Sequence, residues 1–204
     1  MVGISDYPAF VGAVFVFLAI PGPGNLALLT ATGQGGRKGG VSATAGVIVG
    51  DQVLMWAAVA GLAAVLKASP FWFGMIQWAG AFYLAYLGVQ MWRSRPGDAP
   101  ILDMSAGHFF RQTLFITLLN PKAIVFYMAF FPLFIDLQQN PGLDTFGVMA
   151  ITVAALTLLY GVVLTLMAYH LAGRMKHHPL VNRILQKAGA VLLIGFGLRL
   201  VLQK

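Results

Sequence analysis

Two ionisable residues lie deep inside long apolar runs. Asp51 stands ten residues into the run Val41–Leu66, about 15 Å along a helix, and Lys122 stands inside the run Phe109–Ile135. A charge at the bilayer centre costs at least ~2.5–3.5 kcal/mol on insertion scales, so such residues usually face a bundle interior and mark a transport route. Because their signs are opposite, we predict that they approach each other or share a central cavity. A buried ion pair that only fixes packing is the alternative.

Helix breakers occur at matching depth in the first and fourth apolar runs. The first run contains Pro21, Gly22, Pro23, Gly24 and Asn25. The fourth contains Asn120, Pro121 and Lys122. Each set lies about 12–13 residues from the start of its run, near mid-membrane. Proline removes an amide donor and clashes with the preceding turn, so backbone N–H and C=O groups become free there.

Free backbone groups at this depth are costly unless they are buried in protein or line a wet cavity. N–H groups at the start of a half-helix attract a carboxylate, and carbonyls at the end of one attract cations. Asn25 and Asn120 are suitable N-caps for the resumed half-helices. Interrupted segments at corresponding places in two halves indicate a transport site. We therefore predict a midplane site built from both breaks, Asp51 and Lys122.

Composition places these residues in a membrane protein. Of 204 residues, 59% are hydrophobic and 9% are charged, against about 25% charged in a soluble protein. The absence of cysteine excludes disulfides and thiolate metal sites. The formal charge of +7 comes from basic residues in short loops between apolar runs, a pattern typical of membrane topology rather than of nucleic-acid binding.

Apolar runs long enough to cross a bilayer predict one all-α transmembrane domain, residues 1–204, with six spans. The predicted spans are Pro8–Gly33, Val41–Leu66, Pro70–Trp92, Phe109–Ile135, Thr145–Gly173 and Arg183–Leu202. Three spans on each side of the loop 93–107 would give two inverted repeats, about 1–93 and 108–204.

Loop charges predict the orientation. Two basic residues, Lys67 and Lys204, fall on one side. Eight fall on the other, which we assign to the cytoplasm, leaving both termini outside: Arg37, Lys38, Arg93, Arg95, Arg111, Arg174, Lys176 and Arg183.

Small residues at four-residue spacing predict close helix packing. One series is Ser42, Gly46 and Gly50, which would bring Asp51 into the bundle interior. A second series is Thr157, Gly161 and Thr165, for which packing is the default interpretation. Faces of this kind are also compatible with a homodimer.

Motifs for hydrolysis or ATP use are missing from the sequence, and there is no glutamate to pair with an aspartate for catalysis. We therefore expect neither an enzyme nor a resident cofactor or metal. A metal-ion exporter, or an exporter of another small metabolite, would share the six-helix plan, although a metal exporter should carry more histidine or acidic residues in the membrane. A non-transporting assembly factor would leave the matched breaks unexplained.

The motifs together resemble the LysE/RhtB family of bacterial amino-acid exporters. The resemblance runs through almost the whole chain, in Pro21–Asn25, Gly33–Gly40, Gly46–Asp51, Leu87–Gly88, Phe110–Gln112, Leu119–Ala123 and Phe130–Phe134. It implies an inner-membrane exporter of amino acids, such as leucine, homoserine or threonine, driven by the proton gradient.

From both lines we predict a mechanism. Freed amides near Asn25 and Asn120, helped by Lys122, hold the substrate carboxylate. Asp51 pairs with the substrate ammonium or takes up the counter-transported proton.

Overall fold

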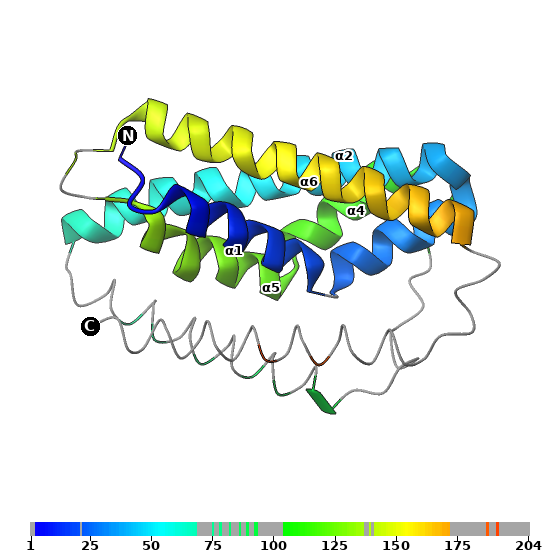
Figure 1. Cartoon of the computed structure of the whole chain (residues 1–204), viewed down its shortest axis with the longest axis horizontal. Helices are drawn as coiled ribbons and strands as arrows, with labels where there is room; N and C mark the ends of the chain where they lie inside the picture. Colours follow the sequence, from blue (N-terminus) through cyan, green and yellow to red (C-terminus); the bar gives the residue numbers. More distant parts are fainter. Residues whose placement is uncertain are drawn as a thin grey trace.

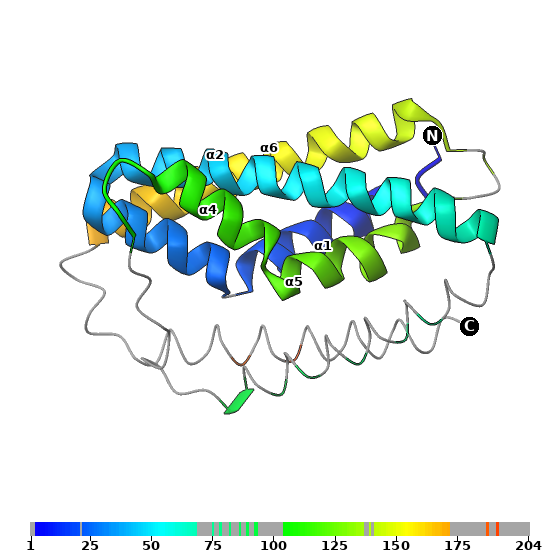
Figure 2. The same cartoon turned by 180° about the vertical axis from the view of Figure 1, so that it is seen from behind.

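The computed structural model describes residues 3–20, 22–68, 104–136, 139 and 141–171, with isolated positions at 75, 78, 82, 86, 89, 92, 93, 187 and 191. The described elements are helices, packed lengthwise into a bundle (Figures 1 and 2). The predicted spans Pro70–Trp92 and Arg183–Leu202 lie outside the described residues apart from those positions, as do most of the loop 93–107 and Pro21.

The first predicted span is broken, as expected. Helix α1, Tyr7–Ala19, begins at the N-cap Asp6, whose carboxylate accepts from the Ala9 N–H at 2.9 Å. It ends at Ala19, and Ile20 turns into extended backbone with φ −64° and ψ 121°. At 1.5 Å per residue, its 13 residues extend only about 20 Å, which is too short to cross a bilayer alone.

Helix α2, Pro23–Ala68, consists of two limbs that reverse at Gly36 (Figure 1). Thr32 and Gly40 would be about 12 Å apart along a straight helix, yet the Thr32 Oγ1 lies 2.5 Å from where a Gly40 Cβ would stand. Gly36 makes the reversal with φ 60° and ψ −151°, a conformation that L side chains rarely adopt. The first limb, residues 23–35, completes the first span with α1. The second limb, residues 37–68, is the second span.

The fourth predicted span is broken too. Helix α4, Phe109–Leu118, bends by 52° into a segment that begins with α5, Pro121–Val125. The π-helix η1, Phe126–Phe130, and the 3₁₀ turn η2, Phe131–Phe134, continue that segment. The wide turns of the π-helix follow the short helix α5, which begins at Pro121.

Helix α6, Leu143–Leu171, forms the predicted fifth span. In the described ranges, two helical stretches are long and apolar enough to cross a membrane, Pro23–Gly61 and Leu143–His170, and the bent pair beginning at Phe109 would be a third. The chain is therefore an all-helical membrane protein with several apolar spans.

The bundle has two distinct ends. At the N-terminal end, Ser5 N–H donates to the Phe134 carbonyl at 3.0 Å, and Asp136 N–H donates to the Gly3 carbonyl at 2.9 Å. At the opposite end, which we call the Arg37 end, the Arg37 guanidinium lies 4.6 Å from the Tyr169 ring centroid and 3.2 Å from His170 Nε2.

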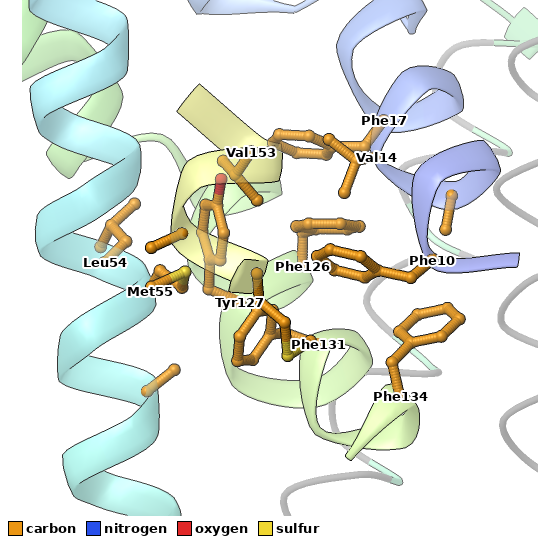
Figure 3. Packing of buried hydrophobic residues seen from close by; sticks show 14 of the residues in the cluster. Phe10, Val14, Phe17, Leu54, Met55, Phe126, Tyr127, Phe131, Phe134 and Val153 are labelled. Atoms are coloured by element: carbon orange, nitrogen blue, oxygen red, sulfur yellow. The ribbon is translucent and has the colours of Figure 1, made fainter. Parts of the chain in front are cut away.

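An aromatic cluster fills the half of the bundle nearer the N-terminal end (Figure 3). The Phe17 and Phe126 rings stack with centroids 4.1 Å apart, and Phe10 contacts Phe131 edge to face at 6.0 Å. These rings bring α1 against the segment that follows the other break.

The Arg37 half is packed differently, with helices crossing at glycine. A Cβ on Gly46 would collide with the Phe110 carbonyl, and one on Gly50 would stand 2.7 Å from Thr117 Cγ2. On the other side, a Cβ on Gly161 of α6 would collide with Thr44 Cγ2. The close approach predicted for these glycines is confirmed.

Candidate functional site

A pocket lies where the two breaks meet. Its empty volume is about 470 Å³ when the open space at its mouth is included. Polar groups from four helices face it, together with an apolar wall. Its lining residues are Phe17, Leu18, Gly24, Asn25, Leu28, Val47, Asp51, Thr117, Asn120, Lys122, Ala123, Thr157, Tyr160 and Gly161.

Lys122 joins the two breaks across more than one hundred residues of sequence. Its ammonium donates to the Phe17 carbonyl at 3.0 Å and to the Ile20 carbonyl at 2.8 Å, and lies 4.6 Å from the Phe17 ring centroid. Carbonyls at the end of a half-helix carry partial negative charge, so they favour this cation. Gly22 permits the approach, because a Cβ there would stand 3.3 Å from Lys122 Nζ.

Asn25 also bonds the carbonyls at the end of α1, a role that the sequence did not predict. Its Nδ2 donates to the carbonyls of Leu18 at 3.0 Å and Ile20 at 3.3 Å, and lies 3.1 Å from the Tyr160 hydroxyl. The expected N-cap role of Asn25 is wrong, because α2 begins two residues earlier at Pro23. Its side chain instead closes the end of α1.

Asn120 is the N-cap that the sequence predicted. Its Oδ1 accepts from the Lys122 N–H at 3.1 Å, and Pro121 follows as the first residue of α5. That position suits proline, because the N–H it lacks would have no partner within the helix. Pro121 and Pro23 are exposed and shape the breaks without lining the pocket.

Asp51 projects from the second limb of α2 and is only 1% exposed. Its Oδ2 accepts a hydrogen bond from Thr157 Oγ1 at 3.4 Å, and the Tyr127 hydroxyl lies close by. Asp51 and Lys122 line one pocket and interact electrostatically. Among the described residues, however, the close partners of the Lys122 ammonium are α1 carbonyls and a ring, and the Asp51 carboxylate is not one of them.

Nine lining residues were not identified as site residues from the sequence, and four of these carry a ring or a hydroxyl: Phe17, Thr117, Thr157 and Tyr160. Thr157 was assigned to packing by its spacing with Gly161, and in the structure its hydroxyl also donates to Asp51. Tyr160 places a polar hydroxyl within an apolar span, a signal that could have identified it.

The pocket offers separate groups to both ends of a zwitterion. An ammonium has three donors, and two of those on Lys122 are used by carbonyls, which leaves one for a ligand carboxylate. The Asp51 carboxylate can accept from a ligand ammonium. Leu18, Leu28 and Val47 supply apolar surface beside these groups. Within the described ranges, no cluster of three or more histidine, aspartate or glutamate side chains could hold a metal ion.

Comparison with known proteins agrees with this picture of a membrane translocator. The family model described as LysE type translocator matches residues 15–204. The chain belongs to the LysE-type translocator family, whose members are transporters and not enzymes.

Curated relatives span nearly the whole chain. A leucine efflux protein of Salmonella choleraesuis (strain SC-B67) is 34% identical over 207 residues, covering 97% of this chain and 95% of that protein. A leucine efflux protein of Klebsiella pneumoniae is 33% identical over 204 residues, with the same coverage. An uncharacterized membrane protein of Pseudomonas aeruginosa is 36% identical over 208 residues, again with that coverage. No solved structure matches the chain.

Proposed function

We propose that this chain exports leucine and related neutral amino acids across the bacterial inner membrane in exchange for protons. The observation that carries the proposal is the pocket between the two breaks, which presents a cation, a carboxylate and an apolar wall together. A leucine zwitterion has the complementary groups. The names of the Salmonella and Klebsiella relatives support the same substrate.

In the proposed bound state, the remaining Lys122 donor and the N-terminal amides of α2 near Gly24 hold the substrate carboxylate. The amides of Leu119, Asn120 and Lys122 already have partners within the chain, so Asn120 contributes to the lining rather than to this end. The substrate ammonium pairs with Asp51, and the isobutyl side chain lies against Leu28 and Val47. Each contact uses a residue that lines the pocket.

Competition between a proton and the substrate ammonium for Asp51 would couple amino-acid transport to proton transport. A buried carboxylate can be neutralised by a proton or paired with the substrate ammonium, and binding one weakens binding of the other. An empty carrier with Asp51 ionised would leave a buried charge without its ligand, which disfavours return without a proton. Exchange of amino acid for proton follows from this competition.

The wider architecture belongs to the same proposal. Six spans in two inverted repeats would let one half rock against the other around a fixed pocket. Arg37, Lys38 and Arg111 belong to the Arg37 end, so the positive-inside rule assigns that end to the cytoplasm and both termini to the periplasm. Assembly into a homodimer remains a prediction of the small-residue faces.

The direct test is counterflow in proteoliposomes preloaded with a panel of amino acids, with and without a pH gradient. We expect leucine exchange that the gradient drives. Asp51→Asn should keep some leucine–leucine exchange but lose its response to pH, with Asp144→Asn at the exposed start of α6 as the matched control. Gradient-driven accumulation by Asp51→Asn would exclude Asp51 as the proton carrier. Folded protein that exchanges no amino acid would exclude the proposed function.

A further inference from the structure

Three buried threonine hydroxyls of α4 and α6 lie against glycines of α2 without a hydrogen-bond partner among the described residues. Thr113 and Thr117 of α4 and Thr165 of α6 are at most 2% exposed, and their Oγ1 atoms have no partner among the described residues. Helical threonines usually bond the carbonyl four residues back, as Thr32 and Thr44 do here at 2.7 and 2.9 Å. A buried polar group left unpaired is costly, so each such group calls for a reason.

The three hydroxyls lie on two sides of α2. Thr165 lies on the α6 side at Gly40, with its Oγ1 2.6 Å from where a Cβ would stand. The other two lie on the α4 side and lead from the Arg37 half toward the pocket. Thr113 lies at Gly46, with its Cβ 3.2 Å from the corresponding position. Thr117 lies at Gly50, beside Asp51, and lines the pocket.

The contact of α2 with α4 at Gly46 and Gly50 is made by small side chains against helix backbone, whereas the Phe109 ring packs against Gly35 and Gly39 nearer the Arg37 end. Gln112 Oε1 of α4 is a further buried acceptor without a partner in the described ranges. By contrast, the other half of the bundle is filled by stacked and edge-to-face rings (Figure 3). Opening on the Arg37 side would give the unpaired hydroxyls water as a partner and lead directly to Asp51.

We propose that the contact of α2 with α4 at Gly46 and Gly50, together with Thr113 and Thr117, forms the hydrated route by which a zwitterionic amino acid enters the pocket from the Arg37 end. The hydroxyls hydrogen-bond the substrate's ammonium and carboxylate in turn as water is removed. This route rests on the proposed function and adds the side and surface by which substrate enters.

The natural absence of cysteine makes the route accessible to thiol labelling. Thr113→Cys and Thr117→Cys would be exposed to a small charged methanethiosulfonate reagent in vesicles whose Arg37 end faces the added reagent. Val153→Cys, in the aromatic cluster and 0% exposed, is the buried control, and Lys38→Cys is the accessible control. Size-exclusion profiles and leucine counterflow before labelling confirm folding.

We expect the two threonine positions to react at least about tenfold faster than Val153→Cys, and leucine to slow that reaction. Reaction at the Val153→Cys rate in variants that still exchange leucine would overturn the route and leave the proposed function standing. Fast labelling that leucine does not slow, with no leucine exchange by the unmodified protein, would overturn the proposed function and leave a hydrated route for another solute.

Discussion

The two halves of the bundle are held together by different kinds of contact. Near the N-terminal end, large rings from α1 and the segment after the second break fill the interior (Figure 3). Near the Arg37 end, the second limb of α2 crosses α4 and α6 at glycines, and threonine hydroxyls stay unpaired in the contact. One half is closed by interlocking side chains, the other by close approach of backbones.

This difference indicates which half opens more easily. Separating stacked rings forfeits many dispersion contacts, whereas separating the glycine–threonine strip gives its unpaired hydroxyls new partners. Lys122 lies at the boundary, attached to the end of α1. On the proposed route, we therefore expect the Arg37 half, and not the aromatic half, to open when substrate enters.

The largest expected effect on stability comes from the aromatic half. Phe131→Ala removes a fully buried ring and should destabilise the protein by roughly 3–5 kcal/mol, the range for large-to-small changes in packed cores. Thermal unfolding in detergent micelles measures the change. Phe15→Ala, on the exposed face of α1, is the matched control. Equal melting temperatures for the two variants would contradict the sealing role of the cluster.

Removing the ammonium at the boundary should act mainly on transport. Lys122→Met keeps a long apolar side chain but leaves the Phe17 and Ile20 carbonyls without their donor. Charged hydrogen bonds contribute roughly 1.5–3 kcal/mol, so leucine counterflow should fall about ten- to hundredfold. Lys38→Met, at the exposed Arg37 end, should transport normally. Normal counterflow by Lys122→Met would remove this residue from the site.

The hairpin at Gly36 should tolerate no side chain. Gly36→Ala forces a residue with a Cβ to φ 60° and ψ −151°, a region essentially confined to glycine, at a cost of about 1–3 kcal/mol. Gly33→Ala, inside the first limb with open space around it, should be neutral or stabilising. The melting temperatures of Gly36→Ala and Gly33→Ala measure this difference. A Gly36→Ala variant as stable as the unmodified protein would argue against the reversal at Gly36.

The smallest expected effect comes from removing one threonine hydroxyl in each half of the bundle. Thr113→Val removes an unpaired hydroxyl and should leave stability unchanged or raised, while slowing leucine counterflow several-fold. Thr152→Val, in the aromatic half, removes a hydroxyl bonded to Tyr7 and to the Val148 carbonyl, and should cost about 1 kcal/mol. If both variants lose equal stability, Thr113 has a partner in the membrane and the comparison fails.

Much of the described fold could be predicted because breakers and apolar length are local signals. Pro23 and Pro121 begin the resumed helices near mid-span, as the sequence indicated. The N-cap role of Asn120 was also predictable, because its bond to the Lys122 N–H spans two residues.

What could not be predicted depends on long-range contacts. Asn25 has the same residue type as Asn120 but bonds carbonyls of the preceding helix and the Tyr160 hydroxyl. The ammonium of Lys122 faces carbonyls, a choice set by how α1 packs against α5 and not by residue type. Thr165 was assigned to packing from the sequence, and only its buried hydroxyl, without a partner among the described residues, distinguishes it.

The central claim is that the pocket between the two breaks holds the amino acid. Isothermal titration calorimetry of leucine with the purified protein, Asp51→Asn and Lys122→Met tests it most directly, with Lys38→Met and Asp144→Asn as controls. We predict that the unmodified protein and both controls bind leucine, and that the two pocket variants lose at least about tenfold in affinity. Binding of leucine by both pocket variants with unchanged affinity would contradict the claim.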